Sequence, residues 1–195
     1  MCSMKNVLFV INTMGRAGAE IAMLELLRSM DPETHNVFLY VLMNQGEMVK
    51  ELPPNVYLLN KNYNDSSVFT TSGRFQLLKH ALRKMVCRNS FVKNAGYFFC
   101  HLLKMLFKGR VRWDKLLWRI ISDGSEVFPE EYDLAVAFLE GGSTYYVADH
   151  VKAKKKVAFV HIDYTSAGYN RKLDKDSYSK MDQIFTVSEE VRNVF

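Results

Sequence analysis

The stretch NVLFVINTMGRAGAEIAMLELL, residues 6–27, decides the fold of this chain. Residues 6–12 form a short, almost unbroken apolar run with β-branched side chains, which is typical of a strand buried on both faces of a parallel sheet. A small turn that contains Gly15 follows, and from Gly18 onward the apolar residues recur at helical spacing. The stretch therefore predicts a strand, a glycine turn and a helix in succession.

The glycine turn is a candidate anion site. Backbone N–H groups at a helix N-terminus point outward, and the helix dipole adds partial positive charge there. Gly15 and Gly18 would let a ligand approach the backbone closely, and the alternative for Gly18 is a structural role in a tight turn. The three-glycine dinucleotide fingerprint and the Gly-Lys-Ser/Thr of a nucleotide-triphosphate loop are both absent from this stretch.

The apolar strand pattern of residues 6–12 returns along the chain. Further buried strands are expected at residues 36–42, 55–59, 132–138, 157–160 and 183–187. Helical patterns or turns separate them, which favours a parallel sheet with right-handed crossovers and a helical layer on each face. The fold class predicted is therefore α/β, a three-layer parallel sheet of about six strands in one domain spanning residues 1–195.

The positive charge of the chain is concentrated in one segment. Residues 74–120 hold 12 Lys or Arg and a single acid, whereas the whole chain has a net charge of +5. Apolar residues at helical spacing predict a basic helical insertion at about residues 73–122. It is either a layer over the sheet with solvated charges or a surface for an anionic membrane. The residues predicted to face the membrane are Lys79, Arg83, Lys84 and Lys104.

The composition of the chain limits the classes of protein to which it could belong. No apolar run is long enough to span a membrane, and the first strand follows the N-terminus without room for a signal peptide. The three cysteines are odd in number and lack metal-ligand spacing, which favours reduced thiols. No nucleic-acid recognition motif accompanies the basic charge, so no nucleic-acid partner is expected. We expect a cytoplasmic protein, either free or peripheral on the inner face of the plasma membrane.

Candidate site residues follow the predicted strands. In open parallel sheets, ligands collect at the carboxyl ends of the strands. Glu140 and Gly141 follow one strand, and His161 and Asp163 follow the next. A histidine in this position is either a hydrogen-bonded structural residue or an active-site residue, and the pattern alone leaves both open. Glu140 and Asp163 could form a glycosidase pair, but nothing in the sequence fixes their separation.

Several of these stretches resemble the N-terminal domain of family-four glycosyltransferases, whose GT-B fold pairs two Rossmann-like domains. MGRAGAE (residues 14–20) is similar to the Gly-Gly-Ala-Glu turn of many members, with Ala17 at the first glycine. KVAFVHIDY (156–164) resembles the K-x-A-W-V-H-x-D stretch of members that make capsular and other surface polysaccharides, with Phe159 at the tryptophan. Residues 46–58, 133–141 and 184–191 also match looser family patterns.

The resemblance implies a retaining transferase that moves a sugar from a nucleotide-sugar donor to a glycan or lipid-linked acceptor, with no cofactor and no metal ion. It implies that His161 is an active-site (catalytic) residue. It places the backbone of Gly15 and Gly18 at the donor diphosphate. The acceptor side would hold Glu140, Gly141 and Asp163.

The family's second domain binds the donor and carries paired glutamates, and it has no counterpart in this sequence. The missing domain is thus an expected partner, and the chain alone is expected not to turn over. Two other classes stay open. One is a non-catalytic Rossmann-like binding module that docks on a membrane or a partner through its basic helices. The other is a small-molecule enzyme complete in itself.

Overall fold

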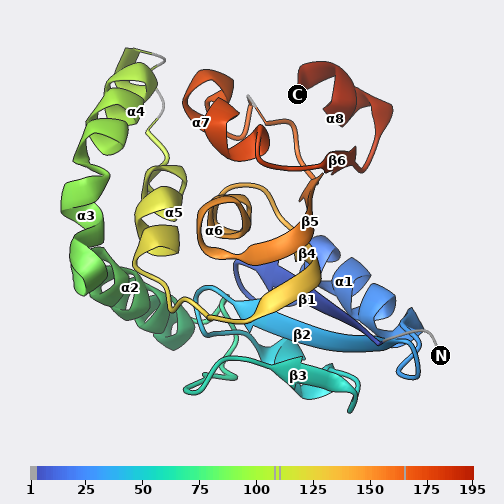
Figure 1. Cartoon of the computed structure of the whole chain (residues 1–195). Helices are drawn as coiled ribbons and strands as arrows, with labels where there is room; N and C mark the ends of the chain where they lie inside the picture. The colour runs from blue at the N-terminus through green and yellow to red at the C-terminus, as the bar shows by residue number, and fades with distance from the viewer. Residues whose placement is uncertain (1–3, 108, 110, 165) are drawn as a thin grey trace.

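The sheet is the centre of the molecule, and every strand pairing in it is parallel (Figure 1). The computed structural model describes all residues except 1–3, 108, 110 and 165. Within the described residues the strand order is β3-β2-β1-β4-β5-β6. The strands are β1 (Lys5–Ile11), β2 (His35–Val41), β3 (Val56–Leu58), β4 (Glu131–Ala137), β5 (Lys152–Val160) and β6 (Gln183–Thr186). The predicted α/β class with a Rossmann-like parallel sheet is confirmed.

Helices cover both faces of the sheet. Figure 1 shows α1 on one side, and α5 and α6 on the other. The helices are α1 (Gly18–Ser29), α2 (Thr71–Val86), α3 (Ser90–Lys93), α4 (Ala95–Phe107), α5 (Trp113–Asp123), α6 (Gly142–His150), α7 (Arg171–Tyr178) and α8 (Glu189–Val194), with 3₁₀ turns η1 (Glu47–Glu51) and η2 (Cys87–Asn89). The run from α2 to α5 lies between β3 and β4 in the chain, and it is the predicted helical insertion.

The alternation of side chains along β1 builds two cores. Leu8 and Val10 join the cluster that includes residues of α6, whereas Phe9 and Ile11 join the cluster that includes α1. All four side chains are buried, which explains why this strand has no polar face. Ile21 of α1 is exposed although it belongs to the predicted apolar stripe, so the buried face of that helix is narrower than its sequence suggests.

Helix α2 buries a different face from the apolar face that its sequence predicts. Its apolar residues Phe75, Leu78, Leu82 and Val86 are all more than half exposed, while Gly73, Ala81 and Lys84 are buried. The reason is a close backbone contact. A Cβ atom added at Gly124, after α5, would lie 1.9 Å from the carbonyl oxygen of Lys84. This contact turns the Lys84 side of α2 inward and leaves the apolar stripe outside.

A buried carboxylate joins the insertion to the rest of the domain. Asp174 of α7 is fully buried and accepts hydrogen bonds from three tyrosine hydroxyls. Tyr97 lies in α4, Tyr145 in α6, and Tyr164 follows β5, with O···O distances of 2.9, 2.9 and 2.6 Å. A buried charge with several donors is stable only while those donors stay in place, so this carboxylate holds four separate segments together.

Candidate functional site

The carboxyl ends of β1, β4 and β5 form the candidate site. These strands are neighbours in the sheet, so the turns that follow them lie at one edge. Glu140, after β4, connects the other two turns. Its Oε2 accepts a hydrogen bond from the backbone N–H of His161 at 3.0 Å, and its backbone carbonyl accepts one from Asn12 Nδ2 at 3.3 Å. The stretches predicted at Gly18, Glu140 and His161 are therefore brought to one edge.

Asn12 is a site residue that sequence reasoning missed. It ends the β1 run and is only 8% exposed. Its Oδ1 accepts a hydrogen bond from the N–H of Ser143 at 2.9 Å, in the first turn of α6, while its Nδ2 reaches the Glu140 carbonyl. One amide thus fixes the turn between β4 and α6 relative to β1. The only sequence signal was a polar residue directly after an apolar strand and before a glycine turn.

His161 lies at the centre of the edge and is half-buried. Its ring packs against Phe138 and Phe159, with centroid distances of 5.3 and 6.1 Å. Burial lowers the pKa of the His161 imidazole, and the Glu140 carboxylate and the Phe138 carbonyl oppose that shift. The imidazole is therefore neutral at pH 7.

One atom of that ring stands out. The Nε2 of His161 is buried and has no hydrogen-bond partner within the described residues. A buried polar atom left without a partner costs about 1–3 kcal/mol. The site thus holds a ring nitrogen that could still accept from or donate to a ligand, although protein atoms cover it in this structure.

The two glycines of the first turn have different environments. Gly15 is buried, and a Cβ added there would lie 2.5 Å from Cγ2 of Val68, so packing alone accounts for it. Gly18 is exposed, a Cβ added there meets nothing within 4 Å, and its φ is not positive. No steric reason requires glycine at position 18. The N-cap residue Ala17 also provides no side-chain hydrogen bond to the start of α1.

Carboxylates oppose an anion at this turn. Glu20 of α1 is 6% exposed, and its Oε1 accepts a hydrogen bond from the Thr13 hydroxyl at 3.4 Å. Burial is the largest cause of a raised pKa for the Glu20 carboxyl, and the charges of Glu47 and Glu140 raise it further. The positive end of the helix dipole at Gly18 favours a bound anion, whereas the negative charge of the nearby carboxylates disfavours it.

Gly141 and Asp163, the two other predicted acceptor-side residues, both have structural roles. Gly141 has φ +79°, and a Cβ added there would lie 2.5 Å from the hydroxyl of Tyr169. Asp163 caps its own turn, because Oδ1 accepts from the N–H of Ser166 at 3.0 Å and Oδ2 accepts from its hydroxyl at 2.6 Å. Their geometry is explained without a ligand.

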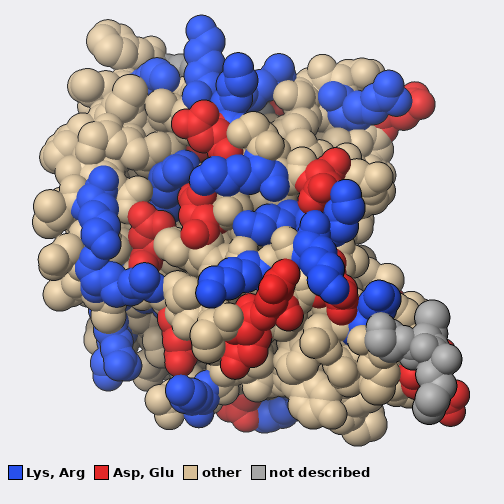
Figure 2. Space-filling view, in the orientation of Figure 1, with Lys and Arg blue, Asp and Glu red and all other residues tan. Residues whose placement is uncertain are grey.

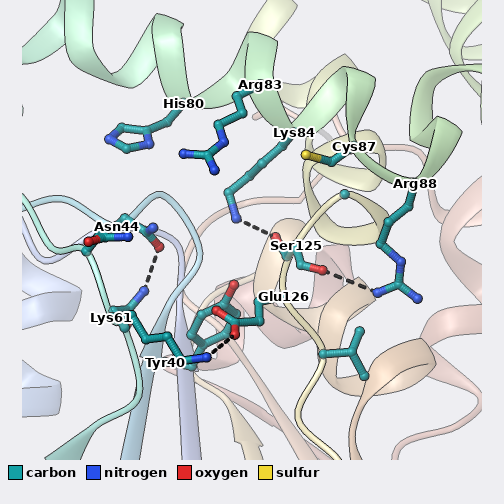
Figure 3. Close-up of a pocket in the computed structure, with 14 residues that line it drawn as sticks. Tyr40, Asn44, Lys61, His80, Arg83, Lys84, Cys87, Arg88, Ser125 and Glu126 are labelled. Atoms are coloured by element: carbon teal, nitrogen blue, oxygen red, sulfur yellow. Dashed lines mark hydrogen bonds and ion pairs between the residues drawn. The ribbon is translucent and has the colours of Figure 1, made fainter.

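The basic residues predicted to face a membrane divide into two groups. Lys79 and Arg83 are exposed and Lys104 is partly exposed. Lys84 is not on that surface: it is 8% exposed, and its Nζ donates to Ser125 Oγ at 2.8 Å. The expectation for Lys84 is corrected here, because the contact at Gly124 turns it inward. It lines a cleft of about 420 Å³ between α2 and the loops beside β2 (Figure 3).

Metal and membrane-spanning sites are absent from the part of the chain that the structure describes. No group of three or more His, Cys, Asp or Glu residues there could hold a metal ion. None of the helices described is long and apolar enough to cross a bilayer.

No protein-family model matches this chain, and neither a curated protein nor a solved structure matches it. The strand order and the all-parallel pairing show a Rossmann-like domain with a helical insertion. Any activity must therefore be argued from the side chains at the sheet edge.

Proposed function

We propose that this chain is the N-terminal, acceptor-side domain of a GT-B glycosyltransferase. It would transfer a sugar from a nucleotide sugar to a glycan or lipid-linked acceptor in surface polysaccharide synthesis. The observation that carries the proposal is the link from Asn12 through Glu140 to His161, which joins the ends of three adjacent strands. The stretches that resemble the glycosyltransferase family include the turns that follow these three strands.

The roles of the residues follow from their environments. The exposed N-terminus of α1 at Gly18 presents backbone N–H groups to the donor diphosphate, and the raised pKa of the Glu20 carboxyl weakens its repulsion of that anion. The neutral imidazole of His161 uses its unpartnered Nε2 to orient a sugar hydroxyl. Because protein atoms cover Nε2, the ring or its neighbours must move when the sugar binds. Glu140 fixes the backbone of His161 through its N–H and so acts as a positioning residue.

The test is an NMR titration of the chain with uridine and guanosine diphosphate sugars. We expect shifts in the amides of residues 17–20 and 140–143 and in the His161 ring, and weaker binding in His161→Gln. The control is His35→Gln, at the start of β2 and thus at the opposite edge of the sheet. An equal effect of both variants, or shifts confined to other regions, would contradict the proposal.

We propose a second function, docking on anionic membranes, on the basis of an exposed apolar surface. We call the following side chains the outer face of the insertion: Phe75, Leu78, Leu82 and Val86 of α2, and Phe99, Leu103, Leu106 and Phe107 of α4. All are more than half exposed, and Figure 1 shows α2, α3 and α4 following one another along one side of the molecule. Figure 2 shows that the surface over α4 is mostly uncharged.

The charge of the side chains beside the outer face is complementary to that of an anionic membrane. Lys79, Arg83 and Lys104 lie on the same helices as the outer face, and no acid occurs in α2 or α4. Basic helices with exposed apolar side chains bind anionic lipid surfaces, and each Lys or Arg near the surface contributes about 1 kcal/mol. Apolar side chains exposed together and bordered by polar residues are typical of contact surfaces for proteins or membranes.

Vesicle sedimentation tests the docking. The chain should sediment with vesicles containing phosphatidylglycerol and much less with phosphatidylcholine alone. Leu82→Ser with Phe107→Ser should abolish sedimentation, and Lys79→Glu with Lys104→Glu should weaken it. Ile21→Ser, an exposed apolar residue of α1 on another part of the molecule, is the matched control. Sedimentation that is unchanged in both double variants would exclude the outer face as the membrane surface.

A further inference from the structure

The cleft beside α2 concentrates positive charge. Its described lining includes His80 and four Lys or Arg side chains, Lys61, Arg83, Lys84 and Arg88, with Glu126 as the only acid. We call it the Lys84 cleft. Figure 3 shows Arg83 and Lys84 pointing from α2 toward the loops that carry Ser125 and Glu126. It lies at the carboxyl ends of β2 and β3, apart from the Glu140 and His161 turns.

Lys84 is the unusual group in this cleft. Its side chain is buried, and its Nζ donates to Ser125 Oγ at 2.8 Å and lies 6.0 Å from the centre of the Tyr40 ring. No carboxylate forms an ion pair with it among the described residues. Buried lysines are rare unless they are paired, because burial disfavours the charged form. That effect lowers the pKa of Lys84 to about 8, which still leaves it mostly protonated at pH 7.

The other charges of the cleft do not neutralise Lys84. Glu126 pairs with Lys61, with Oε1 and Nζ 3.2 Å apart. Arg88 donates from Nη1 to the carbonyl of Ser125 at 3.4 Å, and Arg83 has no acidic partner among the described residues. Burial lowers the pKa of His80, and the charges of Lys84 and Arg83 lower it further, so the cleft already repels one more positive charge.

We propose that the Lys84 cleft binds a phosphate group carried on a small organic molecule. Lys84 supplies a charged donor inside the cleft, and Arg83, on the same side of Ser125, supplies a guanidinium group that can match two phosphate oxygens. Arg88 lies on the other side of Ser125 and adds positive charge while it donates to the Ser125 carbonyl. The cleft volume of about 420 Å³ leaves room for more than the phosphate itself. The proposal uses none of the residues of the proposed transferase site, so either can fail without the other.

The phosphate could come from a sugar phosphate in solution or from a lipid headgroup beside the outer face of α2. The first measurement is calorimetric titration with sulfate, inorganic phosphate and glucose 1-phosphate at pH 7 and constant ionic strength. Lys84→Met should weaken binding of each by about tenfold or more, as expected for loss of a charge-assisted hydrogen bond. Lys84→Arg, which keeps the charge, should retain most of the affinity. The matched control is Lys79→Met, an exposed residue of the same helix outside the cleft, and it should change affinity less than twofold.

A second arm separates the two sources. Vesicles containing phosphatidic acid are compared with vesicles of phosphatidylcholine, again with Lys84→Met. The control for this arm is Lys172→Met, an exposed residue of α7 that belongs neither to the cleft nor to the outer face. Lys84-dependent binding of glucose 1-phosphate assigns a soluble phosphate ester, whereas Lys84-dependent binding confined to phosphatidic acid assigns a lipid headgroup. Thermal melting confirms that each variant is folded. If Lys84→Met behaves like its control with every probe, Lys79→Met for the soluble anions and Lys172→Met for the vesicles, the proposal is overturned. It is also overturned if the folded wild-type chain binds none of the probes.

Discussion

Replacing Lys84 with methionine should make the ligand-free protein more stable at pH 7. The pKa of Lys84 falls from 10.5 to about 8 on folding, mainly because of burial. Each tenfold change in proton affinity corresponds to 1.36 kcal/mol, so the protonated side chain destabilises the fold by about 3 kcal/mol. Methionine has a similar length and no charge, so it removes this penalty.

Part of that gain is lost with the hydrogen bond to Ser125. An intramolecular hydrogen bond contributes about 1 kcal/mol net, and Ser125 keeps its own bond to the carbonyl of Ile121 at 2.7 Å. The net expectation for Lys84→Met is an increase of about 2 kcal/mol in the free energy of unfolding at pH 7. The control Lys79→Met should change that free energy by less than about 0.5 kcal/mol, because Lys79 is exposed.

The gain in stability from Lys84→Met should decrease as the pH rises above about 8. Below pH 8 Lys84 is protonated in both the folded and the unfolded chain, so the full penalty is present. Between about pH 8 and 10.5 the folded state loses the proton first, the penalty shrinks, and the wild-type protein approaches the variant in stability. The other titratable or charged groups facing the cleft are Tyr40, Lys61, His80, Arg83, Cys87, Arg88 and Glu126.

The assay is urea unfolding followed by circular dichroism at several pH values from 7 to 10. Cys87 is changed to serine in all proteins, so that no thiol lines the cleft. Burial raises the pKa of Tyr40 to about 12, so it stays protonated throughout. The reasoning is refuted if Lys84→Met is less stable than wild type by more than about 1 kcal/mol at pH 7, or if the two stability profiles run parallel up to pH 10.

The remaining predictions concern single positions. Gly18→Ala should leave the free energy of unfolding within about 0.5 kcal/mol of wild type in urea, because no atom crowds that position. The same variant should bind nucleotide sugars more weakly in NMR titrations. Unchanged binding would mean that no ligand approaches Gly18. Gly141→Ala should destabilise by about 1–3 kcal/mol in the same assay, because φ is +79° and the Tyr169 hydroxyl occupies the space of a Cβ; a neutral effect would contradict that turn geometry. Asp174→Ala should destabilise by about 3–5 kcal/mol, because three tyrosine hydroxyls lose their acceptor, and a loss below about 1 kcal/mol would show that the network carries no stability.

Much of the fold could be predicted from local pattern. The apolar run at residues 6–12, with no polar alternation, required a strand covered on both faces, and the structure buries both faces of β1. The ends of four of the other strands fall within one or two residues of their expected positions, because β-branched runs bounded by turn residues are a local property. The start of β5 was predicted wrongly: the strand begins at Lys152, five residues before the expected position 157, because the lysines that precede the apolar run pair with β4. The insertion was predicted from helical spacing and from the break in the strand pattern.

The candidate site was only partly predictable. A residue directly after an apolar strand can be placed at the carboxyl edge from sequence, which holds for Glu140 and His161. The part played by Asn12 could not be foreseen, because its partners are 128 and 131 residues away in the chain. Nor could the sequence show that Gly15 packs beneath Val68 while Gly18 is exposed.

The sequence by itself determined which segments form strands and helices, and which side chains share a face of each element. Only the tertiary structure decided the strand order and the direction in which each face points. The physical reason is that periodicity is set by neighbours in the chain, whereas rotation about a helix axis is set by whatever packs against it. In α2 the backbone contact between Gly124 and Lys84 directs a lysine inward and an apolar stripe toward solvent, against the preference of the side chains themselves.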